Sequence, residues 1–369
     1  MPSLQLPSTL LIIASSARML AQSAHQVGIK VLVIDLFADL DTQGYAYDIY
    51  KAASLALADI KAILIGFSER YRVRHIVYGS GVEGFPESLD YLQKHFEILG
   101  NSAEVFYRVQ DKVAFFSTLG RLQITFPPVS FTPPLEAAYW LEKPHLGQGG
   151  YGIKHYAGLS DKPAGNKLKV YWQQYLQGSS HSVLFLANGK KSKPIGFNLQ
   201  WTQVIAGQDF VFAGVITDDL LPETIKAKLA IWLAQLTAIY ALKGLNSLDF
   251  IYAGQSLYVL EINPRPSASM QLYNQNIMQG HLQACLGLGL GESYVEHNHC
   301  GYQIVYAQKD SIIPAQFQWP TECKDIPQAG ALIRIGQPIC SMIARAKSQD
   351  QVFLQLQNIQ QQILKKLQE

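Results

Sequence analysis

Apolar residues near the start of the chain occur in two short runs with a helical pattern between them. Thr9–Ala14 is the first run, and Lys30–Leu36 is the second. Between them, Met19–Val27 has apolar residues at helical spacing and is followed by Gly28, a common helix-ending residue. Strand, helix and strand in this order are typical of a βαβ unit in a parallel sheet. The turn at 14–18 contains no glycine, which argues against a dinucleotide site there.

The rest of the first third of the chain continues this alternation. Helices are expected at Lys51–Gly66 and Pro86–His95, with a strand at His75–Tyr78 between them. Alternating strands and helices predict a doubly wound α/β domain over residues 1–105.

After residue 105 the pattern favours antiparallel hairpins and a long helix. Strands are expected at Tyr139–Lys143, Ile153–Tyr156, Val170–Leu176, Ser182–Ala187, Ser247–Tyr252 and Ser256–Ile262. A helix is expected at Pro222–Lys243, because proline stands near its first turn and Gly244 lies just past its end. Short strand-like runs, such as Tyr302–Ala307 and Ala331–Ile335, precede an amphipathic helix at Asp350–Leu367.

Composition and charge narrow the classes of protein that remain. The chain has 369 residues, of which 48% are hydrophobic, and this is enough for a large core rather than a disordered chain. Its 30 Lys and Arg nearly balance 28 Asp and Glu without a basic stripe, so no nucleic-acid partner is expected. No apolar stretch reaches the roughly 18 residues of a membrane helix, so no membrane partner is expected. Met1–Ser8 lacks the basic residues of a secretion signal, and the four cysteines form no Cys-x-x-Cys pair, so a cytoplasmic protein with reduced thiols is expected.

The most specific chemistry lies in the expected hairpin near residue 260. Glu261 and Asn263 share one face of a strand, because side chains alternate along it. The hairpin can bring Asp249 opposite Glu261, which places two carboxylates and an amide together. Such hard oxygen ligands suit Mg²⁺, and Arg265 nearby can fork onto phosphate oxygens. The alternative interpretation is a hairpin that carries ordinary surface polar residues.

A glycine-rich loop follows the strand that ends at Lys143. Its glycines are Gly147, Gly149, Gly150 and Gly152, and glycines let backbone N–H groups approach a phosphate closely. Lys143 can add a point charge to the same site. The loop is no Walker motif, since no Gly-Lys-Ser/Thr follows, and many glycine-rich loops have no ligand.

In this order and spacing, the motifs resemble the ATP-grasp superfamily, most closely its branch of predicted ATP-dependent carboligases related to biotin carboxylase. The resemblance covers most of the chain and implies an α/β (α+β ATP-grasp) fold. The implied domains are an N-terminal α/β domain (1–105), an ATP-grasp domain (106–300) with a lid subdomain at about 110–175, and a small β-rich C-terminal module (301–369) packed on it.

The resemblance also implies ATP and Mg²⁺ as cofactors, with Mn²⁺ as a substitute, and assigns roles to residues. Lys112 and Lys143 would contact phosphates, and Arg265 would lie near the transferred phosphoryl group. The remaining roles fall to the lid-loop glycines, the adenine hinge and the metal ligands: Gly147, Gly149, Gly150, Gly152; Gln174, Tyr175, Leu176; Asp249, Glu261, Asn263. Two departures stand out: Gln173 and Gln174 replace a common acidic residue at the hinge, and 179–181 (Ser-Ser-His) stands where relatives place a glutamate that touches ribose or metal.

In relatives, turns of the N-terminal domain face the acceptor substrate. The corresponding residues are Ser15, Ser16, Arg18, Ser80 and Glu83. Arg18 would hold a carboxylate and Glu83 an amine. The alternative is ordinary helix capping by the serines and a solvated Glu83.

The expected activity is therefore an ADP-forming ligase that joins a small-molecule carboxylic acid to an amine through an acyl phosphate. A carboxylation through carboxyphosphate and a non-catalytic ATP-binding regulator remain as alternatives. The resemblance also suggests a link to tetrahydromethanopterin-dependent one-carbon metabolism, and it leaves a homodimer open.

Overall fold

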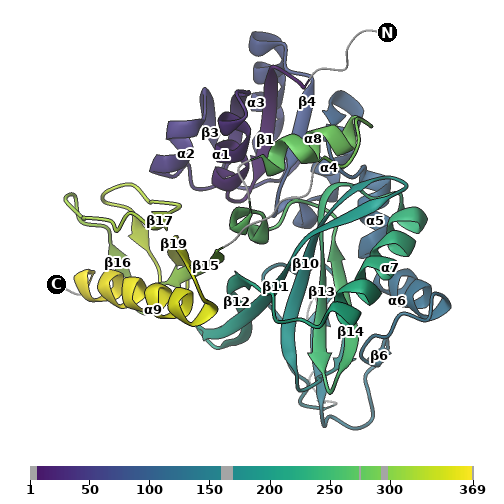
Figure 1. Cartoon of the computed structure of the whole chain (residues 1–369). Coiled ribbons are helices and arrows are strands. Elements are labelled where there is room, and N and C mark those ends of the chain that lie inside the picture. The colour runs from purple at the N-terminus through teal and green to yellow at the C-terminus, as the bar shows by residue number, and fades with distance from the viewer. Residues whose placement is uncertain (1–5, 159–168, 274–275, 292–297, 368–369) are drawn as a thin grey trace.

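The computed structural model describes residues 6–158, 169–273, 276–291 and 298–367. Part of the expected lid, 159–168, lies outside the described residues. The chain is an α/β protein, as the sequence predicts, and its described residues form a parallel sheet near the N-terminus (Figure 1) and three antiparallel sheets after it.

The N-terminal sheet has five parallel strands in the order β3-β2-β1-β4-β5. Its strands are β1 (Thr9–Ala14), β2 (Lys30–Asp35), β3 (Asp48–Lys51), β4 (His75–Tyr78) and β5 (Glu97–Ile98). The helices around it are α1 (Arg18–Gln26), α2 (Leu40–Tyr45), α3 (Leu57–Tyr71), η1 (Val82–Gly84), α4 (Pro86–His95) and α5 (Ala103–Gln110). The central β1 is almost wholly buried, as expected for a strand covered on both faces. Strand order reverses between β1 and β4, so the loops after these strands border a crevice where α/β proteins bind ligands.

One expected helix of this domain begins later than the sequence pattern indicates. The prediction of a helix from Lys51 is wrong, because Asp48–Lys51 forms β3 and α3 begins at Leu57. β3 pairs with β2 in parallel register, so its backbone hydrogen bonds come from a neighbour distant in sequence. Helical spacing alone does not reveal such a pairing.

The largest sheet has eight antiparallel strands in the order β14-β13-β10-β11-β12-β15-β19-β17. They are β10 (Ser179–Asn188), β11 (Ser192–Ile205), β12 (Gln208–Thr217), β13 (Lys243–Ala253), β14 (Ser256–Asn263), β15 (His299–Tyr306), β17 (Cys323–Lys324) and β19 (Pro338–Ala346). The hairpin of β13 and β14 is confirmed, and Asp249 stands directly opposite Glu261. Because β15 pairs with β12, the C-terminal strands extend this same sheet.

A smaller antiparallel sheet, which we call the lid sheet, follows the order β6-β9-β7-β8. Its strands are β6 (Val129–Ser130), β7 (Trp140–Pro144), β8 (Lys154–His155) and β9 (Val170–Gln174). The expected hairpin around the glycine-rich loop is confirmed, since β7 pairs with β8. A two-stranded sheet of β16 (Ser311–Ile312) and β18 (Leu332–Ile333) completes the strands.

Helices cover both faces of the large sheet. They are α6 (Lys112–Arg121), α7 (Glu223–Tyr240), η2 (Ala268–Leu272), α8 (Ile277–Cys285) and α9 (Gln349–Lys366). One core joins α6 and α7 to the sheet, and a second core joins α1 and α8 to its other face. In Figure 1, the N-terminal domain lies above the large sheet, and α9 covers the C-terminal end of that sheet. Within the described ranges, the helices are too short or too polar to cross a membrane.

Candidate active site

Two carboxylates and an amide meet on adjacent strands at the edge of the large sheet. Asp249 lies on β13, and Glu261 and Asn263 lie on β14. Asn263 Nδ2 donates to Asp249 Oδ2 at 3.0 Å. This bond turns the amide oxygen of Asn263 away from Asp249, so that it remains an acceptor. The strands therefore bring together the three residues that the sequence predicts as metal ligands.

The second oxygen of Asp249 has no partner of its own. Oδ1 of Asp249 is buried, and no hydrogen bond to it is formed within the described part of the chain. Burial and the nearby charge of Glu261 raise the pKa of Asp249 to about 7. A cation would relieve both the unmet acceptor and the repulsion, so the donor set fits a hard ion such as Mg²⁺. Among the described residues, no group of three or more His, Cys, Asp or Glu side chains is placed so that it could hold a metal ion, so substrate oxygens would have to complete the coordination.

A buried lysine, Lys112, and a half-buried one, Lys143, lie beside these carboxylates. Lys112, the first residue of α6, is 3% exposed, and its Nζ lies 3.1 Å from Glu261 Oε2. Burial by itself raises the pKa of Glu261, but the charges of Lys112 and Lys143 outweigh it, and the pKa of Glu261 falls. Lys112 is therefore a buried, ion-paired residue and not a solvated lysine at a helix start.

Lys143 approaches from the lid sheet and lacks a direct carboxylate partner. Its Nζ donates to Gln173 Oε1 at 3.0 Å, across the pairing of β7 with β9. Burial and the nearby charge of Lys112 lower the pKa of Lys143, against the opposing effect of Glu261 and Asp249. Gln173 Nε2 is also buried without a hydrogen-bond partner in the described residues. An anionic ligand with several oxygens would satisfy both groups.

The glycine-rich loop closes over the large sheet. Phe212 N of β12 donates to Gly149 O at 2.9 Å, and Gly152 N donates to Gln208 Oε1 at 3.0 Å. Gly150 has φ +79°, and a Cβ there would lie 1.8 Å from Phe210 O. The close approach of two backbones therefore requires glycine at residue 150.

Gly150→Ala is expected to undock this loop. The added Cβ would clash with backbone and would also strain a left-handed conformation. Hydrogen exchange at Phe212 N–H, which bonds to the loop, should become at least about 10-fold faster, equivalent to about 1.4 kcal/mol. Gly149→Ala is the matched control, since its φ is +59° but its nearest contact is an ordinary 3.8 Å. Equal exchange rates in the two variants would contradict the role of the close contact.

The predicted hinge lies at the end of β9. The backbone N–H groups of Gln174 and Tyr175 donate to Pro128 O at 2.9 Å and Tyr139 O at 2.6 Å. These bonds fix the segment that leads to Leu176, which is half-buried. The backbone of Leu176 is thus held in place next to the lid sheet.

Strand register identifies a polar residue that the sequence interpretation missed. Ser182 pairs with Asp249 and shares its face of the sheet, and it accepts a hydrogen bond from Asn198 Nδ2 at 3.2 Å. His181 pairs with Phe250 and lies on the opposite face, where the two rings stack at 5.5 Å. Ser182, and not His181, therefore lies on the same face of the sheet as Asp249, where it could replace the ribose or metal contact of the missing glutamate. A one-residue difference in register, invisible in a single sequence, decides this.

Arg265 lies two residues after the end of β14, which carries two of the predicted metal ligands, and the N-terminal domain binds its side chain. Glu83 Oε1 accepts a hydrogen bond from Arg265 Nε, and both side chains are nearly buried. Ser15 N donates to Ser80 O at 2.8 Å in the neighbouring loop. The structure thus brings Ser15, Ser80 and Glu83 to the side of the site where Arg265 lies.

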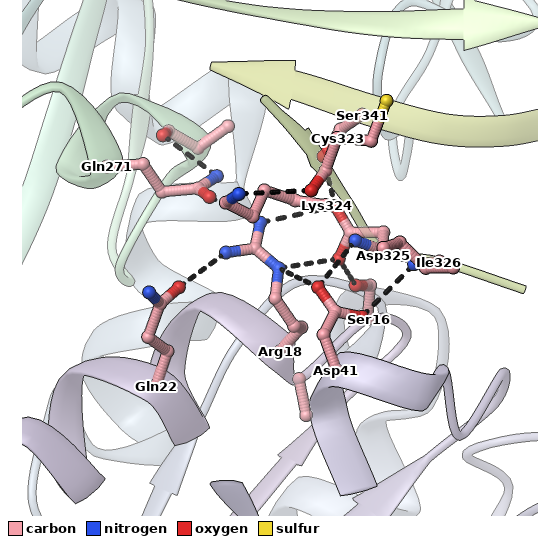
Figure 2. A network of polar contacts seen from close by, with 12 residues as sticks. Ser16, Arg18, Gln22, Asp41, Gln271, Cys323, Lys324, Asp325, Ile326 and Ser341 are labelled. Carbon is pink, nitrogen blue, oxygen red and sulfur yellow. Dashed lines mark hydrogen bonds and ion pairs between the residues drawn. The ribbon is translucent and has the colours of Figure 1, made fainter. Parts of the chain in front are cut away.

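Arg18 and Ser16 instead bind the C-terminal part of the chain (Figure 2). Arg18 is 1% exposed, and its Nε lies 3.0 Å from Asp325 Oδ1. Ser16 Oγ donates to the same oxygen at 3.1 Å, and Arg18 Nη1 donates to Gln22 Oε1 at 2.9 Å. The carboxylate that Arg18 holds therefore belongs to the protein itself. We assign Arg18 and Ser16 to this interdomain contact and not to a substrate contact.

The large antiparallel sheet thus carries the carboxylates, and the lid sheet and α6 bring Lys143 and Lys112 to them. Residues 109–269 match the model of the ATP-grasp domain. The chain is therefore similar to proteins with an ATP-grasp domain, over less than half of its length. It is also 22% identical to an uncharacterized protein of Methanocaldococcus jannaschii over 259 residues. The aligned segment spans 67% of this chain and 64% of the relative's length.

Solved structures share the whole architecture. The biotin carboxylase domain of 2-oxoglutarate carboxylase from Hydrogenobacter thermophilus, solved with MgADP, ADP and bicarbonate, aligns with TM-score 0.75 at 13% identity over 96% of this chain and 90% of that one. N5-carboxyaminoimidazole synthetase from Staphylococcus aureus, solved with ADP, aligns with TM-score 0.69 at 17% identity over 98% and 99% of the two chains. These likenesses establish the fold.

Proposed function

We propose that this protein is an ATP- and Mg²⁺-dependent ligase that joins a carboxylic acid to an amine and releases ADP and phosphate. The observation that carries the proposal is the pair of adjacent carboxylates Asp249 and Glu261, with the buried and unmet Oδ1 of Asp249, beside the buried Lys112 and the half-buried Lys143. Mg²⁺ in proteins is usually held by one or two carboxylates together with substrate phosphates. The match of residues 109–269 to the ATP-grasp domain and the similarity in fold to structures solved with ADP support the same nucleotide.

Each group of residues then has a physical task. Asp249, Glu261 and Asn263 would hold Mg²⁺, which neutralises phosphate charge when it is bound. Lys112 and Lys143 would bind phosphate oxygens. The loop with Gly147, Gly149, Gly150 and Gly152 would cover the phosphates, and the backbone of Gln174, Tyr175 and Leu176 would bind the adenine.

The reaction needs little covalent work from the protein. The substrate carboxylate attacks the γ-phosphorus and ADP leaves, which forms an acyl phosphate. The amine nitrogen then attacks the acyl carbon, phosphate leaves, and the nitrogen loses a proton. Arg265 stabilises charge on the transferred phosphoryl group, and the docked loop keeps water from the acyl phosphate. Ser15 and Ser80 line the side from which these substrates would enter.

The direct test is release of ADP and phosphate from ATP and Mg²⁺ across a panel of carboxylic acids, with and without amines. Bicarbonate is one member of the panel, and its turnover without an amine would indicate a carboxylase. Release that depends on one acid and one amine would support the ligase. Release of AMP and pyrophosphate would refute the acyl-phosphate mechanism. Tight ATP binding without turnover for any member would favour a nucleotide-binding regulator.

Lys143→Met is expected to weaken binding of Mg²⁺-ADP about 10- to 100-fold. The variant removes a charged hydrogen-bond donor, worth roughly 1.5–3 kcal/mol, and keeps the length of the side chain. Titration calorimetry with Mg²⁺-ADP measures the change without any acceptor. Lys154→Met is the matched control, because Lys154 lies on the same hairpin but is 64% exposed and pairs with Glu142. An unchanged affinity in Lys143→Met would remove Lys143 from the nucleotide site.

A further inference from the structure

The loop after β4 contacts the arginine that follows β14. Arg265 Nε donates to Glu83 Oε1, and the two side chains are 10% and 9% exposed. The backbone before Arg265 is fixed as well, since Pro264 O accepts from Asn101 Nδ2 at 2.9 Å. Asn101 reaches β13 too, through Asn246 Oδ1 at 2.7 Å. The N-terminal domain therefore holds both the main chain and the guanidinium group at this position.

Glu83 is itself held rigidly. Its Oε2 accepts a hydrogen bond from Gly81 N within the same short turn. Gly81 has φ +100°, and a Cβ at this residue would lie 1.9 Å from Ser15 Oγ. The turn is thus locked against the loop after β1, and the carboxylate of Glu83 has a fixed direction.

A fixed acceptor on Nε constrains the rest of the guanidinium plane. The two terminal nitrogens of an arginine side chain carry four protons. Within the described part of the chain, Arg265 donates one of these protons, from Nη1 to Pro266 O at 3.3 Å. The remaining donors form the fork that matches phosphoryl oxygens. Without an acceptor on Nε, the long side chain would sample several rotamers and lose this alignment.

We propose that Glu83 is a positioning residue that orients Arg265 toward the transferred phosphoryl group. The proposal rests on the proposed function, because that function places Arg265 beside this group. It replaces the expectation that Glu83 holds the substrate amine, since Arg265 already neutralises the Glu83 carboxylate. Arg265 touches the reacting atoms, and Glu83 acts through it.

The test uses Mg²⁺-ADP with beryllium fluoride, a mimic of the γ-phosphoryl group, so that no acceptor substrate is needed. Titration calorimetry gives the ADP dissociation constant with and without beryllium fluoride. In the wild type, beryllium fluoride should tighten ADP binding. Arg265→Gln should lose most of this tightening, and Glu83→Gln should lose at least 10-fold of it, each judged against the same variant's binding of Mg²⁺-ADP alone.

Two further variants and one control variant distinguish a positioning role of Glu83 from a general structural role. The double variant Glu83→Gln with Arg265→Gln should be no worse than Arg265→Gln alone, because Glu83 acts only through Arg265. Glu83→Asp, which keeps the charge on a shorter side chain, should recover part of the tightening. Glu87→Gln, the same change on the exposed start of α4, is the matched control and should match the wild type.

The outcomes distinguish this proposal from the proposed function. If the wild type does not bind Mg²⁺-ADP, the proposed function fails. If Mg²⁺-ADP binds but beryllium fluoride does not tighten it, or if Glu83→Gln keeps the tightening that Arg265→Gln loses, the positioning role is overturned. The positioning role is also overturned if Glu83→Gln reduces the tightening by beryllium fluoride by the same factor in the wild-type background and in the Arg265→Gln background.

Discussion

Asp325→Asn is expected to lower the free energy of unfolding by about 3 kcal/mol, because it leaves a buried guanidinium without its main counter-charge. Arg18 is 1% exposed, and Asp325 binds it through both carboxylate oxygens, at 3.0 and 3.2 Å (Figure 2). The loss is at the lower end for buried pairs, since Asp41 Oδ2 remains 3.7 Å from Arg18 Nε. Asparagine is the suitable replacement because residue 325 has φ +53°, a conformation that asparagine tolerates better than alanine. Urea unfolding at pH 7 measures the change.

The pH dependence of this contact has a defined sign. Burial alone would raise the pKa of Asp325, but Arg18 and the hydroxyls of Ser341 and Ser16 outweigh it, and the pKa of Asp325 is lowered. A carboxyl group with a lowered folded-state pKa stabilises the protein above its unfolded pKa and loses this contribution as the pH falls through its folded pKa. The difference between wild type and Asp325→Asn should therefore be full at pH 7 and should shrink below about pH 4.

Asp39→Asn is the matched control in the same cluster, with the opposite expected sign. Asp39 is 7% exposed, and its carboxylate makes no hydrogen bond within the described part of the chain. Burial and the charges of Asp325, Asp35 and Asp41 raise the pKa of Asp39 to about 8. Because the pKa of Asp39 is raised in the folded state, the wild type loses stability as the pH rises from about 4 to 8. The free energy of unfolding of Asp39→Asn should therefore exceed that of the wild type by at least about 1 kcal/mol at pH 8. If both variants lose stability equally at pH 8, the electrostatic account of the cluster is wrong.

Local patterns predicted the elements that carry the candidate metal site. A register shift between Asp249 and Phe250, which the sequence does not show, places Asp249 opposite Glu261, but alternation along β13 and β14 and the short turn between them suffice to predict the hairpin itself. The same holds for α4, whose bounds Pro86–His95 agree with the prediction, since proline begins it and its apolar residues share one face. In these cases, every interaction that fixes the element lies within a few residues along the chain.

Contacts between distant segments could not be predicted in this way. Glu83 meets Arg265 across 182 residues, and Arg18 meets Asp325 across 307 residues. The sequence predicts that Arg18, Glu83 and Arg265 contact ligands, but only the fold shows that Arg265 binds Glu83 and that Arg18 binds Asp325. β11 and β12 were also missed, because most side chains of β11 are partly buried and give no clear alternation. Such residues reveal a strand only once its neighbours β10 and β15 are in place.

Glu261→Gln is expected to reduce Mg²⁺-dependent turnover by on the order of 10³-fold, the largest effect on activity of any single change considered. Glu261 contributes one of the two carboxylates that face the proposed ion, and an amide oxygen lacks the charge to replace it. The amide still accepts a hydrogen bond from Lys112 Nζ, so the local packing of α6 should survive. The initial rate of ADP release with the active acid from the panel, over a range of Mg²⁺ concentrations, measures the change.

The Mg²⁺ dependence separates a metal ligand from a merely structural carboxylate. If Glu261 binds the ion, high Mg²⁺ should restore part of the lost rate in Glu261→Gln, because weak coordination is overcome by mass action. If Glu261 only pairs with Lys112, the rate should not respond to added Mg²⁺. Glu142→Gln is the matched control, since Glu142 pairs with Lys154 on the lid sheet, and it should keep the wild-type rate and Mg²⁺ response. A wild-type rate in Glu261→Gln at every Mg²⁺ concentration would rule out the assigned metal site. If the site is correct, Asp249 would be the only carboxylate left in this variant, and one carboxylate is too little charge to hold the cation and the phosphates as the wild type does.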